Sequence, residues 1–215
     1  PNQFKMKMLE LFTSYIKSTV IEEIILLDTS YRQDTTFAEG TQTLLNIQKM
    51  HALKTLEIKI PFSYQQNHGS DYLKELTTLS LCEFSGSRAL LEEISGHKLQ
   101  GLSLTLNQEV GNWTLTNLFE TLKKFNKLRD LFIQSETCEQ INPDELSMFI
   151  CKLSQFNTLQ GLSLIFPKVN INKSLLEDII SRFLYHHHLQ PKLEFLNYTV
   201  LRLLNKSYIC IKVHN

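Results

Sequence analysis

Three consecutive histidines at 186–188 are the residues whose type and spacing best suit metal chemistry. A metal site needs ligands that converge, but neighbouring residues of a helix point about 100° apart. Pro191 follows closely and indicates the end of a helix, where histidine interacts favourably with the helix dipole. Adding Cys210 and His214 gives no familiar zinc spacing. We therefore expect a helix end here, with no metal site and no cofactor.

The four cysteines are scattered and form no C-x-x-C pair; they are Cys82, Cys138, Cys151 and Cys210. Their number allows two disulfides in a secreted protein or four thiols in a cytosolic one. Four N-x-S/T sequons, against roughly two expected by chance, give weak support to secretion. The balance favours an intracellular, cytoplasmic protein.

Motifs for catalysis are missing from the sequence, which has no Gly-rich phosphate loop, H-E-x-x-H or G-x-S-x-G element. The adjacent glutamates at 22–23 and 92–93 point apart, so neither pair suits acid–base catalysis. One basic cluster is present, formed by Lys123, Lys124, Lys127 and Arg129. It suits a solvated helix end or, alternatively, a docking patch for an acidic partner. We expect no catalytic residue and no enzymatic activity.

The charge balance narrows the classes of partner. Lys and Arg total 22, as do Asp and Glu, so the formal net charge is zero. Nucleic-acid binders usually carry a basic excess, so no nucleic acid is expected. The apolar runs are short and interrupted by charge, which argues against membrane insertion. The chain starts at Pro1 without a signal-peptide pattern, and the lack of Met there suggests a processed chain or a fragment.

A repeat dominates the sequence, because the six residues LQGLSL occur at both 99–104 and 159–164. Alignment on these letters reveals further L-x-x-L-x-L segments. The seven units start at Ile21, Leu53, Leu76, Leu99, Leu128, Leu159 and Leu193. Each alternates apolar and polar residues, which predicts a short strand with one buried face. The sequence thus predicts about seven irregular repeats.

Helical patterns fill the intervals between these strands. Asn142 is placed as an N-cap and Pro143 at the first helical position. An apolar stripe at helical spacing follows, formed by Leu146, Phe149, Leu153 and Phe156. Residues 112–126 and 173–188 repeat the scheme. A further amphipathic helix at 4–18 would make residues 1–19 a cap of the array or a link to sequence outside this chain.

The strand-plus-helix unit resembles leucine-rich repeats, and its length is similar to that of the intracellular ribonuclease-inhibitor-like class. The resemblance implies an α/β solenoid, or horseshoe, in which residues 1–215 form one domain. Its parallel sheet would line the concave face and its helices the convex face. The family's Asn after the last Leu appears only at Asn107, which implies irregular turns. A closed barrel needs eight units, and this chain has seven. A doubly wound sheet would have continuous apolar strands, whereas the strands predicted here alternate apolar and polar residues. Both rival folds are therefore disfavoured.

The polar letters between the leucines would line the concave face. They are Thr55, Glu57, Lys59, Thr78, Ser80, Gly101, Ser103, Thr105, Asp130, Phe132, Gln134, Ser163, Ile165, Phe195 and Asn197. The middle of this surface is small and uncharged, and Phe132 and Phe195 are candidate hot spots for a protein partner. Alternatively, the tail at 208–215 covers part of it.

We therefore expect a non-enzymatic protein–protein interaction scaffold, a subunit or a segment of a larger assembly. Its terminal repeats would need shielding by other residues, which agrees with a place in such an assembly. The alternative is a regulator of an enzyme, similar to leucine-rich GTPase-activating proteins or to a substrate-receptor module of a ubiquitin ligase. A catalytic polar residue would be needed for the former and an adaptor-binding helical motif for the latter, and the sequence shows neither.

Overall fold

The computed structural model describes residues 21–27, 43–45, 52–59, 62–64, 73–82, 90–94, 98–106, 114–135, 142–185, 190–195, 198–202 and 209–213. The fold class is α/β, because parallel strands are connected through helices. The chain divides into two compact units, residues 1–99 and 100–215. The predicted helix at 4–18, the histidines at 186–188 and Asn197 lie outside the described residues.

The first unit contains three neighbouring parallel strands, β1 (Glu23–Leu27), β3 (Thr55–Lys59) and β5 (Thr78–Cys82). They correspond to the first three predicted repeats, and Ile24, Leu56 and Leu79 are buried in register, as are Ile58 and Leu81. Two short strands, β2 (Thr43–Leu45) and β4 (Phe62–Tyr64), pair in a separate parallel sheet. A helical turn at 90–93 adds buried leucines to this core.

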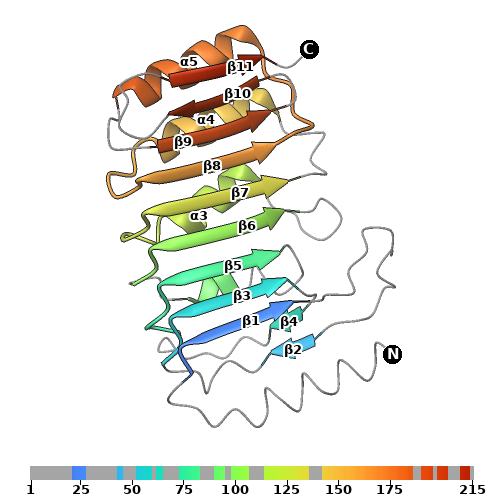
Figure 1. Ribbon diagram of the computed structural model, residues 1–215, viewed down its shortest axis with the longest axis vertical. Helices are drawn as coiled ribbons and strands as arrows, with labels where there is room; N and C mark the ends of the chain where they lie inside the picture. The colour runs from blue at the N-terminus through green and yellow to red at the C-terminus, as the bar shows by residue number, and fades with distance from the viewer. Residues whose placement is uncertain are drawn as a thin grey trace. The chain divides into compact units, whose positions relative to one another are not determined.

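The second unit contains the parallel strands β6 (Gly101–Leu106), β7 (Asp130–Ser135), β8 (Gly161–Phe166) and β9 (Gln190–Phe195). The helices α3 (Leu115–Leu122), α4 (Pro143–Leu153) and α5 (Lys173–Tyr185) connect successive strands and lie behind the sheet in Figure 1. Two antiparallel strands, β10 (Tyr198–Arg202) and β11 (Ile209–Val213), continue the sheet beyond β9.

The three helices begin at side chains that cap them. Asn142, Thr114 and Asn172 each accept a hydrogen bond from a backbone amide two or three residues further on, at 2.7 to 3.1 Å. Such contacts satisfy amides that have no partner within the helix. Pro143 follows Asn142 at the first helical position, as predicted. The predicted helical segments are thus confirmed within the described residues.

Buried leucines form continuous ladders across the second unit. Strands β6 and β8 alternate between half-exposed and buried side chains along their whole length. The strand register aligns Leu102 with Leu131 and Leu162, and it aligns Leu104 with Ile133 and Leu164. All six side chains are at most 3% exposed. The two LQGLSL copies therefore occupy equivalent positions on either side of β7.

A backbone contact recurs at the start of the strands. The carbonyl of the second residue of a repeat accepts two amides of the next repeat, at 2.7 to 3.0 Å. In the first unit, Glu22 accepts from Lys54 and Thr55, and Lys54 accepts from Thr77 and Thr78. In the second unit, Gln100 accepts from Arg129 and Asp130, and Arg129 accepts from Gln160 and Gly161. The shared contact shows that these segments of the chain are structurally equivalent.

Ion pairs reinforce the same edge of the first unit. Lys54 lies 2.7 Å from Glu22, the equivalent residue of the preceding repeat. Lys98 lies 2.6 Å from Glu75, and its hydrogen bond lowers the pKa of the Glu75 carboxyl from its ordinary value. Both pairs are solvent-exposed, so they contribute little to stability.

The last repeat differs in register from the prediction. Strand pairing places Leu193 opposite Leu164 and Phe195 opposite Phe166, so Leu193 takes the last leucine position of its repeat and not the first. The predicted start, Leu193, is five residues too late. Pro191 takes the place that Leu162 occupies in the preceding strand, which hides the repeat pattern.

We predict that Ser135→Ala stabilises the protein. Ser135 is 1% exposed, and its hydroxyl has no hydrogen-bond partner among the described residues. An unsatisfied buried hydroxyl costs about 1–3 kcal/mol, so its removal should raise the free energy of unfolding by about 1 kcal/mol. Urea denaturation would measure this change.

Ser154 provides the matched control, because it is also buried but its hydroxyl donates to the Cys151 carbonyl at 2.8 Å. Ser154→Ala should lower the free energy of unfolding by about 1 kcal/mol. Equal losses for the two variants would contradict the prediction.

Candidate interaction surface

The sheet of the second unit has one face that the described helices do not cover. Helices α3, α4 and α5 all lie on the other side of β6–β9, where the leucines are buried (Figure 1). We call the uncovered side the open face. Its residues are Gly101, Ser103, Thr105, Asp130, Phe132, Gln134, Gly161, Ser163, Ile165, Lys192 and Glu194. It contains every predicted site residue of this unit except Phe195 and Asn197.

Strand register arranges the open face in three rows across the sheet. The rows are Gly101–Asp130–Gly161, Ser103–Phe132–Ser163–Lys192 and Thr105–Gln134–Ile165–Glu194. Neighbouring residues within a row are separated by about 5 Å, the spacing of hydrogen-bonded strands. Phe132 thus has a serine on each side and remains half-exposed. Within its row, the aromatic ring thus has only small residues on the adjacent strands.

The carboxylate of Asp130 lies across the neighbouring strand. A Cβ atom added to Gly161 would collide with Asp130 Oδ1, so the carboxylate occupies the space that a larger residue at 161 would fill. Asp130 is exposed and makes no side-chain hydrogen bond or ion pair with any residue that the structure describes. Glycine at 161 therefore permits the present position of this acidic group.

The remaining charges of the open face lie on β9. Lys192 is exposed and Glu194 is half-exposed, two residues further along the strand. Together they contribute no net charge, which leaves Asp130 as the source of the net negative charge of the described open face.

The predicted site residues of the first unit lie on β3 and β5, where they alternate with buried side chains. Thr55, Ser80 and Glu57 are half-exposed, whereas Lys59 and Thr78 are exposed. Lys59 pairs with Glu57 at 2.5 Å. This intrastrand pair balances the two charges.

Sequence reasoning missed an exposed apolar residue on β1. Ile25 is 48% exposed and pairs in register with Glu57. The alternation of apolar and polar residues that identified the other sites also applies to the repeat starting at Ile21. Extending it to that unit would have found Ile25.

Phe195 was predicted on the binding face, and the structure corrects this. The side chain is 2% exposed and lies in the buried ladder opposite Phe166. Lys192 and Glu194 take the open-face positions of β9 instead. The error follows directly from the register of the last repeat.

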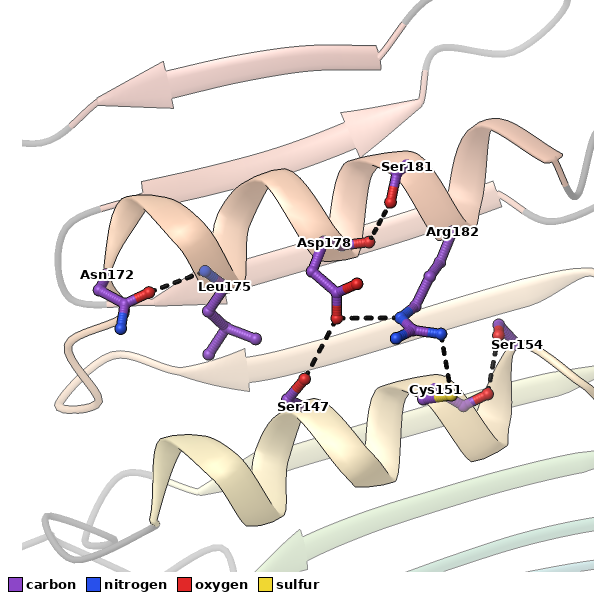
Figure 2. A network of polar contacts seen from close by, with 8 residues as sticks. All are labelled: Ser147, Cys151, Ser154, Asn172, Leu175, Asp178, Ser181 and Arg182. Carbon is purple, nitrogen blue, oxygen red and sulfur yellow. Dashed lines mark hydrogen bonds and ion pairs between the residues drawn. The ribbon is translucent and has the colours of Figure 1, made fainter.

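A polar network connects α4 to α5 on the helical side of the sheet (Figure 2). Asp178 Oδ2 accepts hydrogen bonds from Ser147 Oγ at 3.2 Å and from Arg182 Nε at 3.0 Å. Arg182 Nη1 also donates to Cys151 Sγ at 3.0 Å. The hydrogen bond with Asp178 raises the pKa of the Arg182 guanidinium. These groups bind one another across two helices, which suits a structural contact between repeats.

The predicted basic cluster at the end of α3 is exposed, and part of it is engaged within the unit. Lys123 pairs with Glu120 at 2.8 Å. Its ammonium also lies 5.3 Å from the centre of the Phe119 ring, and Lys152 lies 5.2 Å from the same centre. These contacts stabilise the helix end.

No helix in the described segments is long and apolar enough to cross a membrane. Within those segments, no group of three or more His, Cys, Asp or Glu residues could hold a metal ion. The geometry therefore defines an α/β protein with an open sheet face. Comparisons with family models, curated proteins and solved structures find no match for this chain.

We predict that the two phenylalanines differ sharply in their effect on stability. Phe195→Ala should lower the free energy of unfolding by about 3–5 kcal/mol, because it opens a cavity in the buried ladder. Phe132→Ala should cost about 1 kcal/mol or less, because the ring is partly in water. Urea denaturation of both variants would compare them, and equal losses would contradict the assignment of the two faces.

Proposed function

We propose that this chain is a non-enzymatic protein-interaction scaffold of the leucine-rich-repeat type. In this proposal the repeats form a solenoid, and the open face is the concave surface that binds a protein partner. The half-exposed Phe132, which lies between Ser103 and Ser163 in the strand register, is the observation that carries the proposal.

The physical argument rests on how closely a partner can approach this face. Ser103 and Ser163 keep the surface low on both sides of Phe132, so a partner can contact the ring and the adjacent backbone together. Side chains that become fully buried near the centre of an interface are typical hot spots of protein binding. Ile165 extends the apolar area on the next strand.

Polar groups elsewhere support a structural rather than a catalytic use. Asp178 and Arg182 bind each other and the neighbouring helix, and Glu57 binds Lys59. The proposal also includes an intracellular location, which is supported by the thiol of Cys151. Reduced thiols are the common form of cysteine in the cytosol.

The test is to capture partners from a native extract with the complete chain, identify them and measure their affinity. Phe132→Ala should weaken the affinity for a specific partner at least tenfold, because loss of a hot-spot side chain costs about 2 kcal/mol or more. Thermal unfolding of the same variant should change little.

Met148→Ala is the matched control, because Met148 is an exposed apolar residue on α4, 53% exposed, on the helical side. This substitution should leave the affinity unchanged. Loss of binding with Met148→Ala but not with Phe132→Ala would assign the partner to the helices and overturn the proposal.

A further inference from the structure

We propose that the partner presents a cationic side chain, best fitted by arginine, to the Asp130 carboxylate and packs its stem against Phe132. This inference rests on the proposed function of the open face. It adds the chemistry of the segment that binds there, which is basic and not acidic or purely apolar.

The position of Asp130 supports a cationic contact. Its carboxylate is exposed and has no ion-pair or hydrogen-bond partner in the described part of the chain. It lies over Gly161, which has no side chain of its own. A charged group without a partner among the described residues of a binding face can form an ion pair with the bound molecule, where exclusion of water strengthens it.

The distance to Phe132 favours arginine. Asp130 and Phe132 are two residues apart on one strand and face the same side, so their Cα atoms are about 7 Å apart. A guanidinium binds a carboxylate through two parallel hydrogen bonds. Its plane and its aliphatic stem also pack well against aromatic rings. One arginine can therefore contact both residues.

The other charged residues near Phe132 do not change the preference for a bound arginine. Lys192 lies two strands from Phe132, about 10 Å away, and Glu194 follows it on the same face. An acidic partner group near Lys192 would also approach Glu194. Arg129 is exposed at the start of β7, but no ion pair joins it to Asp130 among the described residues. Asp130 thus gives the described open face a net charge of −1.

The probe is a displayed library of random 12-residue peptides, selected on the complete chain. We expect the Phe132-dependent binders to be enriched in Arg or Lys and depleted in Asp and Glu. The best binder is then synthesised with its basic residue intact or replaced by citrulline or acetyl-lysine, which remove the charge and keep most of the size. Both forms are titrated against the wild-type chain and Asp130→Asn.

A double-mutant cycle gives the expected result. Removal of either charge alone should weaken binding about tenfold, and removal of the second should add little, because the two charges act as one pair. Rising salt should weaken the wild-type complex and leave the Asp130→Asn complex nearly unchanged.

Two further variants test the position of the Asp130 carboxylate separately from its charge. Gly161→Ala should weaken binding with the charge intact, because the new Cβ displaces the carboxylate. Glu177→Gln removes an equivalent charge from the helical side, where Glu177 is exposed on α5, and should have no effect.

The outcomes distinguish this inference from the proposed function. Binders that depend on Phe132 but are neutral or acidic, or that show independent effects in the cycle, would overturn the inference and leave the proposed function in place. An empty selection, or binders that tolerate both Phe132→Ala and Asp130→Asn, would overturn both.

Discussion

The paired hydrogen bonds at one carbonyl between successive repeats fix the register on which the rest of the sheet depends. In the second unit, the Gln100 carbonyl accepts hydrogen bonds from the amides of Arg129 and Asp130, and the Arg129 carbonyl makes the same contact with the next repeat. Side chains of a strand alternate between two faces, so a slip of one residue would exchange the buried and exposed sets. Leu131 would then face water and Phe132 would face the helices. The open face exists because this contact excludes that slip.

The parts of the fold that the sequence predicted are those encoded within single repeats. Leu102 and Leu104 alternate with small residues, so both the strand and its buried side can be inferred. Asn142 and Pro143 identify the start of a helix from neighbouring letters alone. At β9 this local information fails, because Pro191 replaces a ladder leucine and Leu193 resembles the start of a unit. The placement of Phe195 failed for the same reason.

Contacts between repeats could not be predicted from the sequence, because they depend on which residues the strand register brings together. Glu145 lies in the first turn of α4, yet its carboxylate accepts a hydrogen bond from the Thr116 amide at the start of α3, at 3.3 Å. The Asp130 carboxylate over Gly161 is a second case. Residues about 30 positions apart in the sequence give no indication of either contact until the strands are aligned. The candidate site could thus be placed on a face, while its charge and shape needed the structure.

The two LQGLSL copies give β7 identical neighbours on both sides. Gly101 and Gly161 flank Asp130, and Ser103 and Ser163 flank Phe132. In these two rows, β6 and β8 therefore present the same residues, and only the middle strand, β7, differs. A periodic surface offers a partner several equivalent positions shifted by one strand, whereas a single interruption defines one. The repetition that gives the sheet its regularity thereby makes β7 the strand from which a binding partner can take its alignment.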